Sequence, residues 1–373
     1  MAESTRLVDL VQTRIDEFLA EQTPQLASIA PELDPFITFS RGFLAGGKRF
    51  RALFCYWGWQ AVASEGSVFD LAPENSARAD LPAVVTAASA LEVFHAAALV
   101  HDDIMDNSDT RRGSPSAHKR FESMHIDGLW LGNSSVFGKS AALLLGDLLL
   151  SWSDELFDTG LRQLPSADAA RAARTEYNLM RTEVTVGQYL DILEESSWAT
   201  AEESELLSRA HRVIVYKSAK YSVEAPLSIG AALGGASLQQ RAALREYGLP
   251  IGIAYQLRDD MLGVFGDPQI TGKPAGDDLR EGKRTVLIAL ARAGMSSSSR
   301  RIFDELLGDR DLEETQVSML QQTIRDSGAI ERVESIIDRN VGQAIDTIRD
   351  APLSASAREQ LIQLADTVIK RAS

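Results

Sequence analysis

Apolar residues recur at three- and four-residue spacing over long stretches of the chain. The clearest stretches are 81–104, 140–156, 205–233 and 320–348. This spacing gathers apolar side chains on one face of an α-helix, and residues with high helix propensity fill most other positions. The apolar/polar alternation that is typical of half-buried strands is scarce. The pattern therefore predicts an all-α protein, a single large helical bundle.

The composition is compatible with one large folded domain. The chain has 373 residues, of which 45% are hydrophobic and 24% are charged, so it can bury a sizeable core. No Pro/Gly/Ser-rich linker divides the sequence, which favours one domain over two. The single cysteine, Cys55, excludes an internal disulfide and a cysteine-based metal cluster, and we expect it to be a buried structural thiol.

Charge and hydropathy narrow the possible partners and the location. A formal net charge of −15 argues against nucleic-acid binding, because phosphate backbones need a basic surface. The N-terminal sequence MAESTRLVDL lacks the basic and apolar regions of a signal peptide. The most apolar run, 141–152, is too short to span a bilayer and contains Asp147. We therefore expect a soluble, cytoplasmic protein without a transmembrane segment.

A first acidic cluster, LVHDDIMDNSDTRRG, ends the apolar helical stretch 81–104. Asp102 and Asp106 are four residues apart, so both carboxylates lie on one helix face. Without a cation they would repel each other at the negative end of the helix dipole. Mg²⁺ takes one or two carboxylates and completes its coordination with water and substrate phosphate. The cluster is therefore a candidate metal site, with a solvated acidic helix end as the structural alternative.

A second acidic cluster, GIAYQLRDDMLGVFGDP, contains Asp259 and Asp260 and again follows an apolar helical stretch. Two such motifs that end helices of one bundle could face each other across a cavity and share several metal ions. This second occurrence favours the metal site over the solvated helix end.

Basic residues cluster near both motifs although the protein is acidic. Guanidinium groups bind phosphate oxygens bidentately, and Gly46 and Gly47 allow close backbone approach to a ligand. The pattern favours two diphosphate sites, one neutralised by metal and one by cations alone. The basic residues are Lys48, Arg49, Arg51, Arg111, Arg112, Lys217, Lys220, Lys273 and Lys283.

Two segments, 64–80 and 125–137, are predicted to be inserted loops whose role the sequence leaves open. Residues 132–140, GNSSVFGKS, are similar to a phosphate-binding P-loop. They have five rather than four residues between the glycines and no preceding strand, so we reject that reading.

In their order along the chain, the motifs resemble those of the trans-prenyl diphosphate synthases, the polyprenyl synthetase family, over residues 46–285. The resemblance implies the isoprenoid synthase fold, one domain over 1–373 with C-terminal helices at 300–373, and a homodimer. The matching elements are GGKRFR at 46–51, Glu92 and His95, DDIMD at 102–106, RRG at 111–113, GD at 146–147, GQYLD at 187–191, KS at 217–218, YQLRDD at 255–260 and GKPAGDDLREGK at 272–283.

The resemblance also implies roles for many of the matching residues. It implies Mg²⁺ as cofactor, as three ions once substrate is bound, with Mn²⁺ as a possible substitute. The direct metal ligands would be Asp102, Asp106 and Asp259, supported by Asp103 and Asp260. Isopentenyl diphosphate would be bound by Lys48, Arg51, His95 and Arg112. The allylic diphosphate would be bound by Arg111, Gln188, Lys217, Ser218, Gln256, Lys273 and Lys283, of which Lys217, Ser218 and Gln256, with Asp102 and Asp259, would be catalytic.

The chain departs from the family pattern at two positions. Gly263 stands where many relatives have a third aspartate in the second motif, so metal affinity could fall. Ser218 replaces the usual threonine and keeps its hydroxyl. His95 alone would be read as a core histidine, and only its place seven residues before Asp102 makes it a candidate ligand.

The length of the product is expected to depend on the helix that carries the first motif. Helical spacing back from Asp102 reaches Ala98 and then Phe94, with Ala97 beside them. The two alanines leave room where short-chain relatives carry an aromatic residue, and Phe94, about 12 Å from Asp102 at 1.5 Å per residue, is a candidate floor. We expect geranylgeranyl diphosphate, made from isopentenyl diphosphate and dimethylallyl, geranyl or farnesyl diphosphate, with longer chains second.

Two other functions remain open at this stage. A terpene cyclase would share the fold and the first acidic motif but would not need the isopentenyl diphosphate residues Lys48, Arg51 and His95. A non-catalytic partner subunit would tolerate a weakened metal motif, to which Gly263 points. The sequence does not fix the product length, the allylic primer or the oligomeric state.

Overall fold

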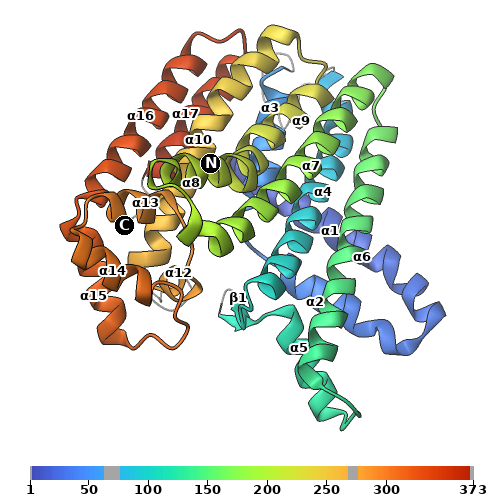
Figure 1. The fold of residues 1–373 in the computed structure, drawn as a ribbon. Coiled ribbons are helices and arrows are strands. Elements are labelled where there is room, and N and C mark those ends of the chain that lie inside the picture. The colour runs from blue at the N-terminus through green and yellow to red at the C-terminus, as the bar shows by residue number, and fades with distance from the viewer. Residues whose placement is uncertain (1, 63–75, 112, 268–275, 370–373) are drawn as a thin grey trace. The chain divides into compact units, whose positions relative to one another are not determined.

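The computed structural model describes residues 2–62, 76–111, 113–267 and 276–369 of the chain (Figure 1). Within these ranges the only strands are β1 (Thr110–Arg111) and β2 (Ser114–Pro115), which pair antiparallel. Almost all the other described residues are helical, so the predicted all-α fold class is confirmed.

The chain divides into two compact units. Unit 1 comprises Met1–Arg174 and Ile229–Ala236, and unit 2 comprises Thr175–Ser228 and Ser237–Ser373. The divisions at 174/175 and 228/229 fall inside helices α7 (Ala167–Ser197) and α9 (Ala225–Leu233) rather than in a linker. The single domain expected over 1–373 stays a prediction.

Unit 1 is built around the long apolar helix α4, which packs against α1, α2, α3, α5 and α6. In Figure 1, α6 runs alongside α4. The close approach depends on Gly160 of α6, where a Cβ would lie 2.9 Å from Ala83 O and 3.0 Å from Ala87 N. The elements of this unit are α1 (Ala2–Ile29), η1 (Pro31–Leu33), α2 (Asp34–Leu44), α3 (Phe50–Gln60), α4 (Ser76–Met105), β1, β2, α5 (Ala117–Asp127), α6 (Ser134–Arg162), the first turns of α7 and the end of α9.

Helices α4 and α6 are both long and apolar enough to cross a membrane by length and composition. In α4, 83% of the apolar window is buried inside the protein, as in the core helix of a folded domain. In α6 only 28% of the window is buried, so this helix keeps an exposed apolar face.

Cys55 is fully buried in α3, as the sequence predicts. Burial raises the pKa of its thiol to about 12, so the thiol stays protonated and unreactive at neutral pH. Gly230 of α9 makes room beside it, because a Cβ there would lie 1.8 Å from Cys55 O.

Unit 2 is centred on α10, which contacts η4, α12, α13, α16 and α17. In Figure 1, α16 and α17 lie alongside α10, and the Tyr247 hydroxyl of α10 donates to Leu361 O of α17 at 2.6 Å. The elements of this unit are the rest of α7, η2 (Trp198–Thr200), η3 (Glu203–Glu205), α8 (Leu206–Val213), η4 (Ile214–Glu224), the start of α9, α10 (Leu238–Phe265), α12 (Asp277–Glu281), α13 (Val286–Ala293), α14 (Ser297–Leu306), α15 (Glu314–Asp326), α16 (Ala329–Arg349) and α17 (Ala355–Ile369).

Two of the predicted helical stretches are confirmed and two need correction. The stretches 81–104 and 140–156 lie inside α4 and α6. The stretch 320–348 is two helices, because Gly328 adopts a left-handed φ of 72° between α15 and α16. The stretch 205–233 is continuous, but its middle part, η4, is a π-helix rather than an α-helix.

The predicted loop 125–137 is mostly helical. Helix α5 ends at Asp127, and α6 begins at Ser134 after the Asn133 side chain accepts a hydrogen bond from Val136 N at 3.0 Å. The rings of His125, Trp130 and Phe137 pack together across the short turn between them. Since a helix and not a strand precedes 132–140, the P-loop reading is wrong. Most of the other predicted loop, 64–75, lies outside the described residues, and its end, 76–80, is the start of α4.

Candidate active site

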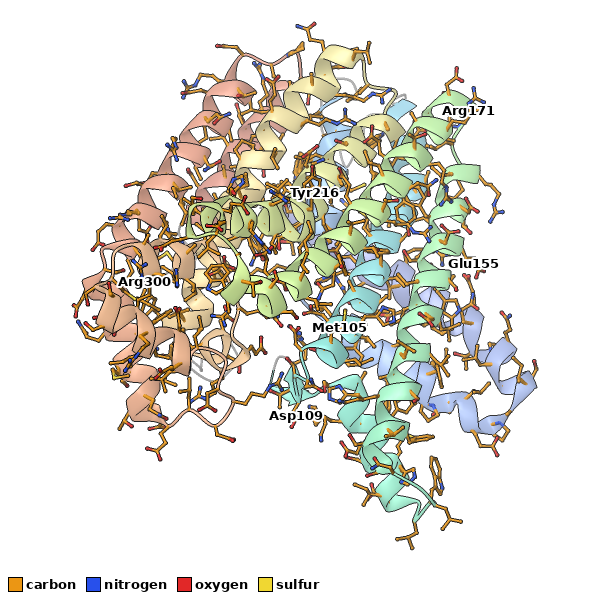
Figure 2. All side chains as sticks on the ribbon, in the orientation of Figure 1. Met105, Asp109, Glu155, Arg171, Tyr216 and Arg300 are labelled. Atoms are coloured by element: carbon orange, nitrogen blue, oxygen red, sulfur yellow. The ribbon has the colours of Figure 1, made fainter. Side chains whose placement is uncertain are left out.

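The first acidic motif lies at the C-terminal end of α4. The helix ends at Met105, and the backbone N–H groups of Asp106 and Ser108 still donate to Asp102 O and Asp103 O, at 2.8 and 2.9 Å. The side chain of Asp102 is 22% exposed, so it is open to a ligand in solvent. Figure 2 labels Met105, where the helix ends, and Asp109, just before the β1–β2 ribbon.

Asp103 is fully buried and is held by Arg111. The Arg111 Nε donates to Asp103 Oδ1 at 2.9 Å, a second guanidinium nitrogen donates to the same oxygen, and Nη2 lies 3.5 Å from Asp102 Oδ2. Arg111 belongs to β1, and Gly113, at a φ of 73°, turns the ribbon back. The structure therefore holds the expected allylic-diphosphate ligand Arg111 beside the motif, with Asp103 as its counter-charge.

Only two of the three cations in segment 46–51 remain accessible. Arg49 is 6% exposed and adopts a left-handed φ of 48° just before α3. Its guanidinium lies 3.4 Å from Glu92 Oε2 of α4, and Glu92 Oε1 accepts from Ala52 N at 3.1 Å. Arg49 and Glu92 thus join α3 to α4, whereas Lys48 is exposed and Arg51 is half-buried.

His95 and the GD motif lie near the same end of α4. His95 is half-buried, seven residues before Asp102. In α6, a Cβ on Gly146 would lie 2.2 Å from His101 Nε2, and Asp147 Oδ1 is 3.4 Å from that nitrogen. The glycine therefore makes room for His101, and the aspartate pairs with it. Sequence reasoning missed His101, although its position next to Asp102 was a usable signal.

The second acidic motif lies in the last turns of α10. Asp259 is exposed, whereas Asp260 is 5% exposed and accepts a 2.7 Å hydrogen bond at Oδ1 from Gln256. Its Oδ2 has no hydrogen-bond partner among the described residues. Burial raises the pKa of Asp260 well above its ordinary value; the Gln256 hydrogen bond opposes this shift, and the carboxylates of Asp278, Asp259 and Asp191 add to it.

A buried arginine, Arg258, determines which side of α10 faces α16. Arg258 is 4% exposed and donates to both carboxylate oxygens of Glu334 in α16, at 2.6 and 2.8 Å. Because Arg258 and Asp259 are neighbours on a helix, their side chains diverge. The pairing of Arg258 with α16 therefore leaves Asp259 on the exposed side of α10.

The predicted cations Lys217 and Lys283 share one carboxylate in unit 2. Lys217 Nζ is 2.5 Å from Asp191 Oδ2 in α7, and Lys283 Nζ is 3.6 Å from the same atom. Lys283 also lies 3.0 Å from Glu195, one turn further along α7. Asp191 belongs to the GQYLD motif, but the sequence alone indicated no role for it, and it gave no signal for Glu195. The predicted ligand Gln188 is half-buried on α7, three residues before Asp191.

Lys217 and Ser218 lie in the π-helical segment η4, whose Tyr216 is labelled in Figure 2. The Ala225 N–H bonds to Lys220 O, five residues back, and Pro226 follows with no N–H of its own. Two glycines in neighbouring helices let the backbones meet. A Cβ on Gly187 of α7 would lie 2.4 Å from Lys217 N, and one on Gly252 of α10 would lie 2.5 Å from Ala219 O. Segments of π-helix are rare and are frequent at functional sites.

The other predicted site residues are placed as follows. Phe94 is 4% exposed, Ala97 is fully buried and Ala98 is half-buried, all in α4. Arg112 and Lys273 lie outside the described residues. The roles predicted for all these residues stay predictions.

The carboxylates present are suited to Mg²⁺. Within the described ranges no group of three or more His, Cys, Asp or Glu side chains is placed to hold a metal alone. Mg²⁺ uses one or two carboxylates and takes its other ligands from water and phosphate. Asp102 and Asp106 supply such a pair of hard oxygen donors, and the buried Asp260 Oδ2 marks a second place where a hydrated cation would satisfy an oxygen.

Comparison with known proteins defines the class. Residues 38–324 match the family model of polyprenyl synthetase. The chain is 31% identical to the geranylgeranyl diphosphate synthase of Methanosarcina mazei over 88% of this chain and 86% of that one. It is 30% identical to the geranylfarnesyl diphosphate synthase of Aeropyrum pernix, over 88% and 91%.

A solved structure gives the same result for the fold. The geranylgeranyl pyrophosphate synthase of Corynebacterium glutamicum, complexed with isoprenyl diphosphate and magnesium, is 38% identical with a TM-score of 0.88 and covers 98% of this chain and 99% of that chain. This chain therefore belongs to the polyprenyl synthetase family. It is a prenyltransferase of the trans-prenyl diphosphate synthase type.

The Arg49–Glu92 pair provides a test of the local structure. We expect Arg49→Met to lower the free energy of unfolding by about 3–5 kcal/mol, because Glu92 would be left buried without a counter-charge. Urea denaturation measures the change. The matched control, Lys48→Met, should change stability by less than about 0.5 kcal/mol because Lys48 is exposed. Equal effects of the two substitutions would contradict the structural role of Arg49.

Proposed function

We propose that this chain condenses isopentenyl diphosphate with an allylic diphosphate to form a linear trans-prenyl diphosphate, chiefly geranylgeranyl diphosphate. The observation that carries the proposal is that both acidic motifs, at the ends of α4 and α10, lie within the matched region 38–324. The basic residues at 48–51, 111–112, 217–220 and 273–283 lie in that region too. The match to a Methanosarcina mazei geranylgeranyl diphosphate synthase supports the product, while the Aeropyrum pernix match supports a longer product as the alternative.

The chemistry is a transfer of the allylic group. The allylic C1–O bond breaks, the isopentenyl double bond attacks C1 through C4, and a proton leaves C2 for the departing diphosphate. Bound Mg²⁺, with Asp102, Asp106 and Asp259 as proposed ligands, would stabilise negative charge that grows on that leaving group. Arg111, Lys217 and Lys283 would do the same with fixed positive charge. No motif side chain is needed as a general base.

The counter-charges in unit 2 set the position of the two lysines. Asp191 holds Lys217 at 2.5 Å, and Lys283 is held by Asp191 and Glu195. Because these contacts fix the ammonium groups before substrate arrives, little ordering remains to be done when the diphosphate binds.

Mass analysis of products from farnesyl and isopentenyl diphosphates with Mg²⁺ tests the proposal. We expect Lys217→Gln to lower kcat by about 10²–10³-fold, because a preorganised charge next to the leaving group is lost. Lys220→Gln is the matched control. Lys220 lies in the same segment and likewise pairs with a carboxylate, Glu183 at 2.5 Å, but it belongs to none of the family motifs, so we expect a much smaller fall in kcat. Product from farnesyl diphosphate alone would indicate a terpene cyclase, and an inactive purified chain would indicate a non-catalytic subunit.

Phe94 is proposed to limit the length of the product. We expect Phe94→Ala to shift the product toward longer chains, because the 4% exposed ring would no longer block the space beside Ala97 and Ala98. Val93→Ala is the control, because Val93 is equally buried in α4 but faces about 100° away. Mass spectrometry of the products gives the measurement. An unchanged product profile for Phe94→Ala would refute the assignment.

We also propose a soluble, cytoplasmic homodimer formed through α6. Val136, Leu143 and Leu144 of this helix are 62%, 50% and 57% exposed, and Leu129 and Leu131 in the preceding turn are 89% and 98% exposed. Large apolar side chains exposed together on one helix are typical of an interface, and a second copy would cover them symmetrically.

Light scattering after size exclusion measures the oligomeric state. We expect the wild-type mass to be twice that of one chain, and Leu144→Glu to give a monomer. Ile302→Glu is the control, because Ile302 is 49% exposed on α14 in unit 2 and should leave the dimer intact. A monomeric wild type that binds lipid vesicles would show instead that the apolar face of α6 contacts a membrane.

A further inference from the structure

A cavity of about 180 Å³ lies in unit 2, where α7, η4, α9 and α10 meet. All of its lining residues belong to this unit. Because a cavity of about 150 Å³ can admit a molecule of the size of benzene, this one has room for a small organic ligand. Its polar lining residues are Glu176, Glu183, Lys220, Glu224, Ser228 and Arg245.

The cavity lies on a different side of α7 from the predicted ligand Gln188. Glu183 precedes Gln188 by five residues, which at about 100° per residue places the two side chains about 140° apart around the helix. On η4, Lys220 lines the cavity, whereas Lys217 pairs with Asp191. The cavity is therefore separate from the predicted diphosphate sites.

Two of the three carboxylates that line the cavity are paired. Glu176 Oε1 accepts a 2.6 Å hydrogen bond from Arg245 Nη2, and Glu183 Oε1 accepts one of 2.5 Å from Lys220 Nζ. The third is Glu224, whose buried Oε2 has no hydrogen-bond partner among the described residues. Burial raises the pKa of Glu224, although the nearby Lys220 opposes the shift. The charged form of Glu224 would therefore be stabilised by a further cation.

Ser228 supplies a second, independent acceptor in the cavity. It is 1% exposed, and in the described part of the chain its hydroxyl also has no hydrogen-bond partner. A buried hydroxyl without a hydrogen bond is unfavourable. Since Ser228 follows Glu224 by four residues, the two side chains lie on one face of the helix. One ligand group with several donors would satisfy both oxygens.

A primary ammonium group has the chemistry that these acceptors need. It combines a positive charge with three N–H donors. A bare metal ion is less suitable, because within the described ranges no three or more His, Cys, Asp or Glu side chains are placed to hold one. Leu179, Met180 and Ala225 complete the lining, and they would pack against a short alkyl chain.

We propose that this cavity binds a small alkylammonium ion, whose ammonium group donates to Glu224 and Ser228 and whose alkyl chain contacts Leu179 and Met180. The ligand would contact η4, the segment that carries Lys217. This site goes beyond the proposed function and does not depend on it.

Binding of n-butylammonium chloride tests this inference. The melting temperature of the full chain is measured as the salt is added, with sodium chloride keeping the ionic strength constant. We expect a saturable rise for the wild type. The neutral 1-butanol lacks the charge, and tetramethylammonium lacks N–H donors. Each should need a concentration at least about tenfold higher for the same rise, because charge-assisted hydrogen bonds are stronger than neutral ones.

Three variants locate the binding. Glu224→Gln keeps the size of the side chain but removes its charge, and it should raise the half-saturating concentration about tenfold or more. Ser228→Ala should raise it about threefold through the loss of one neutral hydrogen bond, without lowering the melting temperature of the free protein. Glu246→Gln is the matched control, because Glu246 is exposed on α10 outside the cavity, and its midpoint should stay within about twofold of wild type.

Each other outcome overturns the inference. A midpoint unchanged in Glu224→Gln would place the binding elsewhere. Equal effects of butylammonium and 1-butanol, or of butylammonium and tetramethylammonium, would show that the charge or the N–H donors are not recognised. A wild type without a saturable rise would show that water alone fills the cavity. Because neither diphosphate nor Mg²⁺ is added, these results leave the proposed function untouched.

Discussion

A buried carboxylate needs a counter-charge, and three buried carboxylates near the motifs have one. Asp103 is held by Arg111, Glu92 by Arg49, and Asp191 by Lys217 and Lys283. An uncompensated buried charge costs several kcal/mol, so each pair constrains where its helices can lie. Asp102, Asp106 and Asp259 are more exposed than these three.

Much of the fold could be predicted from the sequence because helical periodicity is a local signal. The stretches 81–104 and 140–156 lie inside α4 and α6, and both acidic motifs end or nearly end their helices as expected. Errors arose where one residue changes the backbone. Gly328 divides 320–348 into two helices, and Asn133 starts α6 inside a segment whose composition is typical of a loop.

The residue types of the site could be predicted, but the ion pairs between its cations and carboxylates could not. The order of motifs identified the carboxylates and cations, yet nothing in AGGKRFRAL shows that Arg49 turns inward while Lys48 stays in solvent. That depends on a left-handed residue and on Glu92, 43 positions away. Similarly, Gly263 read alone indicates a lost aspartate. Only the fold shows that the Asp278 side chain occupies the space beside Gly263.

The π-helical segment η4 changes which residues share a face along a continuous helix. Residues of α8, η4 and α9 follow one another without a break, but the winding is looser in the middle. Because of η4, residues of α9 that follow residues of α8 at α-helical spacing do not lie on the same face of the helix. An alignment or a redesign that applied one helical repeat across 206–233 would assign side chains after Glu224 to the wrong side, and a one-residue deletion there would rotate everything that follows.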